Sequence, residues 1–138
     1  MADADTSVDN LERFDVFLKD YPSGQGYKGI VYYAQDSLDV GMKRFDYGPV
    51  ENMEKYGQLK PPEVPLQDYN LPTALVAGTL DKLADLKDVA WLREQIKDKV
   101  VFYNEYALGH MSFALAKDMS WFTKDVVSVI EKYATNIF

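Results

Sequence analysis

The sequence predicts an α/β fold in which two parallel strands alternate with helices. The run "TALVAG", from Thr73 to Gly78, is short and unbroken in its apolar character, which is typical of a strand covered on both faces. An amphipathic helix follows, and then the strand candidate "KVVFYNEY" and a closing helix. Because a right-handed crossover sets two such strands parallel in one sheet, this order predicts a parallel sheet flanked by helices.

The first half of the chain has the apolar period of helices. In "SVDNLERFDVFLKDYP" apolar side chains recur at helical spacing until Pro22 ends the pattern. "GYKGIVYYAQDSLDVGMKRF" repeats the pattern, and "FDYGPVENMEKYG" predicts a turn and a short helix that Gly57 closes as C-cap. The two apolar stripes are Val8, Leu11, Phe14, Phe17 and Leu18, then Ile30, Tyr33, Ala34, Leu38 and Met42.

A proline-rich stretch separates the two halves. Pro61, Pro62 and Pro65 exclude a helix and predict an extended linker. We therefore expect a helical segment over residues 1–60, a linker over 61–72 and a β-α-β-α portion over 73–138. The helices of the last portion should turn inward Leu86, Val89, Leu92 and Ile96, and then Phe122, Val126, Val129, Ile130 and Tyr133.

Two parallel strands are too few for a self-contained sheet. Parallel sheets occur almost only where both faces and both edges are covered, and a bare edge invites aggregation. We therefore expect another protein chain, or an upstream segment, to supply the missing sheet neighbours.

Composition excludes several classes of partner and site. The net charge of -7, from 22 acids against 15 bases with no basic cluster, argues against nucleic acid and against an anionic membrane surface. The absence of cysteine excludes a disulfide framework and a thiolate zinc site. No run is long and apolar enough to span a bilayer, and the N-terminus "MADADTSVDN" does not have the pattern of a secretory signal. The compartment stays unknown.

Two residues that follow the predicted strands could do chemistry together. Asp81 comes just after the first strand, and His110, the single histidine, lies in "EYALGHMSF" just after the second. The carboxyl ends of parallel strands are where catalytic groups gather. A carboxylate that hydrogen-bonds an imidazole fixes its tautomer and stabilises the imidazolium formed in general-base catalysis.

Each residue also has a structural interpretation. A histidine beside a glycine in a loop is more often a surface or hydrogen-bonded structural residue. Asp81 could instead cap the helix that follows it, and Asp85 could do the same.

Four segments resemble the acid lipases, the gastric and lysosomal lipase family of α/β-hydrolases, from about Leu11 to the C-terminus. They are "RFDVFLKDYPSGQGYKGIVYYAQ", "FDYGPVENMEKYGQLKPPEVPL", "GTLDKLADLKDVAWL" and "GHMSF". The resemblance implies that this chain is the C-terminal part of an α/β-hydrolase fold, with a helical segment that follows the lid.

The resemblance also implies roles for particular residues. Asp81 matches the acid of the catalytic triad and His110 its base, whereas Asp85 matches a second acid outside the triad. Leu108, Met111 and Phe113 are the apolar residues that would line an acyl pocket near the histidine. The substrates would be carboxylic esters of lipids, no cofactor or metal would be needed, and the family's location would be secreted or lysosomal.

The sequence departs from the family in two respects. Ser112 stands where the family usually has an aspartate two residues after the histidine. No GxSxG nucleophile motif occurs in the 138 residues, and none of the serines lies on a predicted strand-to-helix elbow. Since loss of the serine nucleophile lowers turnover by roughly six orders of magnitude, we expect this chain to be inactive alone.

Three hypotheses follow for the function. In the first, the chain is part of a lipase whose serine another chain or an upstream region supplies. In the second, it is a non-catalytic structural subunit of a larger assembly, derived from a lipase. In the third, it is a free-standing domain that binds partners through its apolar edge.

Overall fold

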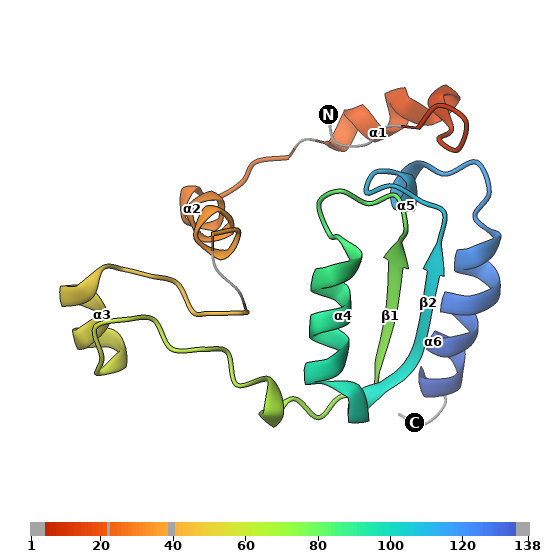
Figure 1. Ribbon diagram of the computed structural model, residues 1–138. Helices are drawn as coiled ribbons and strands as arrows, with labels where there is room; N and C mark the ends of the chain where they lie inside the picture. The colour runs from red at the N-terminus through yellow and green to blue at the C-terminus, as the bar shows by residue number, and fades with distance from the viewer. Residues whose placement is uncertain (1–4, 22, 39–40, 135–138) are drawn as a thin grey trace. The chain divides into compact units, whose positions relative to one another are not determined.

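The computed structural model describes residues 5–21, 23–38 and 41–134, which divide between two compact units (Figure 1). One unit combines residues 5–21 with residues 67–134, and the other lies within residues 22–66. The N-terminal residues join the C-terminal half because the Asn10 N–H donates to the Leu115 carbonyl at 2.6 Å. This division differs from the segments 1–60, 61–72 and 73–138, which stay a prediction about the sequence.

The sheet has two parallel strands, as predicted. β1 (Thr73–Gly78) pairs with β2 (Val100–Tyr106), in a register that runs from Ala74 opposite Phe102 to Gly78 opposite Tyr106. Both strands point toward the short helix α5 (Ser112–Leu115) (Figure 1). The loops that carry the predicted site therefore leave the sheet at the same end, where both strands have their carboxyl ends. No sheet neighbour from another chain is shown.

Helices flank the two strands. α4 (Leu86–Gln95) packs against β1, and α6 (Val127–Ala134) continues a π-helical turn over Phe122–Val126. α1 (Phe14–Asp20) extends a 3-10 turn at Leu11–Arg13. Two further 3-10 turns lie at Leu66–Asp68 and Lys97–Lys99. Among the described residues, no helix is both long and apolar enough to cross a membrane.

The second predicted helix ends earlier than its apolar stripe suggested. α2 spans Tyr27–Asp36, so Leu38 and Met42 lie beyond it. The Gln35 side chain donates to the Asp46 carbonyl at 2.8 Å and accepts from the Asp46 N–H at 3.0 Å. This pair turns the following chain back beside the end of the helix. Periodicity alone could not reveal it, because it joins residues that are eleven positions apart.

α3 (Pro49–Tyr56) confirms the short helix expected before the linker. Proline occupies its first turn, where the missing N–H costs no helical hydrogen bond. Gly57 closes the helix with a left-handed φ of 71°, and its N–H donates to the Met53 carbonyl at 3.0 Å. Glycine takes this conformation without a steric penalty, as the C-cap prediction requires.

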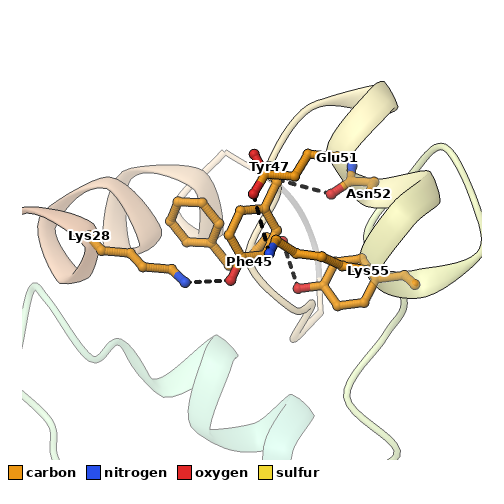
Figure 2. A network of polar contacts seen from close by, with 7 residues as sticks. Lys28, Phe45, Tyr47, Glu51, Asn52 and Lys55 are labelled. Carbon is orange, nitrogen blue, oxygen red and sulfur yellow. Dashed lines mark hydrogen bonds and ion pairs between the residues drawn. The ribbon is translucent and has the colours of Figure 1, made fainter.

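Polar contacts and packed aromatic rings, rather than buried apolar side chains, hold the unit within residues 22–66. Asn52 is fully buried, and it accepts from the Tyr47 N–H at 2.9 Å (Figure 2). It also donates to Asp46 Oδ1 at 2.6 Å. The ammonium groups of Lys28 and Lys55 lie 4.4 Å and 4.7 Å from the centre of the Tyr47 ring. No apolar side chain of this unit is buried among the described residues.

The apolar core is small and lies in the other unit. Its buried apolar residues are Ala77, Ile96, Leu108, Leu115 and Ala116. Three of these five, Leu108, Leu115 and Ala116, lie in the loop after β2 or in α5 and its C-cap. The best-covered part of the unit is therefore the end of the sheet that carries the predicted site. Of the side chains predicted to face inward, Ile96 is buried, whereas Phe122 and Ile130 are exposed.

Candidate functional site

Asp81 and His110 meet at the carboxyl ends of the two strands. Asp81 Oδ2 lies 3.0 Å from His110 Nδ1. The Asp81 side chain is 4% exposed and that of His110 is 44% exposed. A buried carboxylate thus fixes one ring nitrogen, while much of the imidazole surface faces outward.

Backbone hydrogen bonds bring the two loops together. The N–H of Thr79 donates to the Tyr106 carbonyl at 2.8 Å, and that of Leu80 donates to the Leu108 carbonyl at 3.2 Å. Gly78 makes this approach possible, because a Cβ there would lie 2.2 Å from the Leu108 carbonyl oxygen. The glycine that ends the apolar run is therefore needed for the close approach of the two loops.

The two oxygens of Asp81 have separate partners. Oδ1 accepts from the N–H groups of Leu83 and Ala84 at 2.8 Å and 2.9 Å, and Oδ2 contacts the histidine. The N-cap of α4 is instead Asp85, which accepts from Lys87 N and Asp88 N. The alternative that Asp81 caps the helix is therefore wrong: the cap is Asp85, and Asp81 holds its own turn and the histidine.

The electrostatic environment of Asp81 favours its charged form. Burial raises the pKa of the carboxyl, but the N–H groups of Ala84 and Leu83 and the contact with His110 together outweigh burial. The pKa of Asp81 is consequently held below its ordinary value. An ionised carboxylate at this place is what stabilises an imidazolium.

The residues expected to line an acyl pocket differ in burial. Leu108 is buried, and Met111 and Phe113 are half-buried. The Phe113 ring packs edge-on against Trp121, with centroids 5.2 Å apart. Their role as a pocket stays a prediction.

A groove of about 510 Å³ lies beside the carboxylate of the site. Its walls come from the loop after β1, from the histidine loop and from the N-terminal segment. They are Asp5, Thr6, Thr79, Leu80, Asp81, Lys82 and Gly109. The part that the N-terminal segment plays here was not predicted from the sequence. The contribution of the N-terminal segment is revealed by contacts between residues more than a hundred positions apart in the sequence. One of them is the hydrogen bond that Lys117 Nζ donates to the Thr6 carbonyl at 3.0 Å.

Among residues 5–21, 23–38 and 41–134, no group of three or more His, Asp or Glu side chains is arranged to hold a metal ion. The contact between Asp81 and His110 can orient a base and stabilise its protonated form.

Comparison with known proteins finds lipases. The chain is 33% identical to mouse lipase member K over 111 residues, which is 79% of this chain and 28% of the relative. It is 32% identical to rat lysosomal acid lipase/cholesteryl ester hydrolase over 126 residues, which is 90% of this chain and 32% of the relative. Triacylglycerol lipase 2 of Arabidopsis thaliana is 34% identical over 122 residues, covering 80% of this chain and 29% of the relative.

The chain thus spans about a third of the length of the curated relatives it matches. No family model matches it.

Proposed function

Because this chain belongs to the acid lipase family, we propose that it forms the C-terminal part of a hydrolase of lipid carboxylic esters. In this proposal Asp81 is the triad acid and His110 the triad base. The serine nucleophile comes from outside the 138 residues, in another chain or an upstream region. The observation that carries the proposal is the 3.0 Å contact between the buried Asp81 carboxylate and His110 Nδ1 at the carboxyl ends of two parallel strands.

The chemistry follows from this contact. With Nδ1–H donating to Asp81, Nε2 of His110 takes the proton of the serine hydroxyl as the serine oxygen attacks the ester carbonyl. The imidazolium then gives that proton to the departing alcohol as the acyl-enzyme forms. In the second half, Nε2 takes a proton from a water molecule as the water oxygen bonds to the acyl carbonyl carbon. The ester bond to the serine then breaks, the carboxylic acid leaves, and the imidazolium returns the proton to the serine oxygen.

The extent of exposed surface supports the need for a companion. Large apolar side chains lie at the surface: Tyr27 is 82% exposed and Leu38 is 87% exposed.

The alternative is a non-catalytic subunit derived from a lipase. One observation favours it, namely Ser112 in place of the aspartate usual in the family. Serine carries no charge, so Ser112 cannot replace the electrostatic effect that an aspartate at this position would have on the histidine loop. Both hypotheses share the fold and the companion, so they differ only in whether the site is active.

A fluorophosphonate probe, which reacts with activated serines, distinguishes the two hypotheses. The probe is applied to the larger protein or complex in which the chain occurs, and the labelled residue is identified by mass spectrometry. We expect a label on a serine outside residues 1–138. His110→Ala should abolish this label, whereas Asp85→Asn, the matched control, should retain it because asparagine also caps helices.

Each other outcome has a definite meaning. A label on a serine of this chain, lost in His110→Ala, would contradict an external nucleophile. A complex that takes no label would support the non-catalytic subunit. Hydrolysis of a short p-nitrophenyl ester by the isolated chain, abolished by His110→Ala, would refute the expectation that it is inactive alone.

A further inference from the structure

Two buried polar atoms near the histidine loop have no hydrogen-bond partner in the part of the chain that the structure describes. They are Oδ1 of Asp9 and Oγ of Ser112. A third such atom, Nε1 of Trp121, belongs to the ring that packs edge-on against Phe113. Asp9 is 1% exposed and Ser112 is 0% exposed. Native proteins rarely leave such atoms unsatisfied, and two of them in one small core call for a common explanation.

The fold places Asp9 beside α5. Asp9 lies opposite Ala116 in an isolated antiparallel bridge. Backbone hydrogen bonds of 2.6 Å and 2.8 Å lie on either side of this bridge and join its neighbouring residues. In a pair of this kind the Cα atoms are about 4.5 Å apart and both side chains point to the same side.

Ser112 lies on that same side. The Ala116 N–H donates to the Ser112 carbonyl at 2.8 Å, so Ser112 precedes Ala116 by one helical turn. Residues four apart on a helix share a face, with Cβ atoms about 5–6 Å apart. Asp9 and Ser112 therefore flank the same alanine.

The carboxylate of Asp9 is held in a defined orientation. Its Oδ2 accepts from the Asp5 N–H at 2.9 Å, and the Asp9 N–H donates to the Asp5 carbonyl at 2.7 Å. This closed turn leaves Oδ1 inside the unit. A hydroxyl hydrogen can rotate toward an acceptor, so Ser112 is a suitable donor.

We propose that one buried water bridges the two atoms, accepting from Ser112 Oγ–H and donating to Asp9 Oδ1, and that Asp9 is thereby a positioning residue for His110. The Ser112 N–H donates to the Gly109 carbonyl at 3.2 Å, which closes the turn that carries the histidine. Fixing Ser112 thus fixes this turn. The inference rests on the proposed function only in that His110 is the proposed base.

An exchange of charge tests the pair. Ser112→Asp, made in the larger protein or complex in which the chain occurs, would set a second carboxylate beside that of Asp9, inside the unit. We expect this variant to unfold at a lower urea concentration and to lose the NMR signal of the His110 ring N–H held by Asp81. Adding Asp9→Asn should restore both properties, because an amide donates to the new carboxylate. Asp5→Asn, the matched control, removes the same charge four residues away and should restore neither.

The proposal is overturned if Ser112→Asp folds but Asp9→Asn does not restore its stability and its His110 ring N–H signal, or if Asp5→Asn restores them equally. Should Ser112→Asp not fold in any background, the single variants Asp9→Asn and Ser112→Ala and their double variant decide. Coupling of about threefold or more in the unfolding equilibrium constant supports the pair, and additive effects refute it. None of these measurements uses ester turnover, so a failure here is distinct from a failure of the proposed function.

Discussion

At the scale of single residues, the site depends on one carboxylate whose two oxygens have different partners. Asp81 Oδ1 holds the turn at Leu83 and Ala84, and Oδ2 holds His110. A carboxylate fixed in this way needs little reorganisation when the imidazole becomes charged, which is the condition for electrostatic stabilisation. The same residue is thus structural for its loop and, in the proposed function, part of the triad.

Gly78→Ala should separate the two loops of the site. The added Cβ would meet the Leu108 carbonyl oxygen at 2.2 Å, and this atom belongs to the backbone, so it cannot move without moving the loop. We expect a loss of about 1–3 kcal/mol in the free energy of unfolding, measured by urea denaturation. The His110 ring N–H signal should also shift in NMR spectra.

Gly24→Ala provides the control for this substitution, since nothing lies within 4 Å of its added Cβ. It should change the free energy of unfolding by less than about 0.5 kcal/mol. Equal stability of Gly78→Ala and the unsubstituted chain would show that the loops do not depend on this close approach.

At the scale of elements, capping determines where the helix after the first strand begins. Asp85 accepts from two N–H groups at the start of α4, and two other acids nearby, Asp81 and Asp88, do not share this role. The sequence block around it contains three acids within eight residues. The sequence left open whether Asp81 or Asp85 caps the helix, and the geometry of the loop gives this role to Asp85.

Asp85→Ala should therefore destabilise the unit without disturbing the site. We expect a loss of about 1 kcal/mol in the free energy of unfolding, because two N–H groups lose their acceptor. Asp85→Asn should cost much less, and the contact of Asp81 with His110 should persist in both variants. A large loss of the His110 N–H signal in Asp85→Ala would indicate that the cap also orders the loop that carries Asp81.

At the scale of the whole molecule, ionised carboxylates with lowered pKa values occur in both units. Asn52 and the Gly48 N–H lower the pKa of Asp46 in one unit. In the other, burial acts against the lowered pKa of Asp81, but backbone N–H groups and His110 outweigh it. Each such group binds a proton more weakly when folded than when unfolded, so acid favours the unfolded chain.

Stability should therefore be lost at the acid end. The contribution of Asp81 is fully present above its unfolded pKa of about 3.9, and it falls as the pH drops through the lower folded pKa. Urea denaturation at a series of pH values should show a free energy of unfolding that declines below about pH 4. Asp81→Asn should flatten this decline. An unchanged slope in that variant would contradict the lowered pKa of Asp81.

The sequence by itself determined the elements and the partners in the site. Unbroken apolar character and helical spacing are local properties, so they identified both strands, α3 with its C-cap, and α4. The order of the strands then placed Asp81 and His110 at one edge, and the structure brings them to 3.0 Å. Their spacing follows from the rule that parallel strands end at the same side of a sheet.

Tertiary structure alone decided what depends on contacts between distant residues. It ended α2 through the pairing of Gln35 with Asp46, and it brought Asp9 against the helix that follows His110. It also decided between two candidate caps, since Asp85 rather than Asp81 caps α4. No periodicity encodes these contacts, because each depends on where the folded chain returns rather than on what its neighbours in sequence prefer.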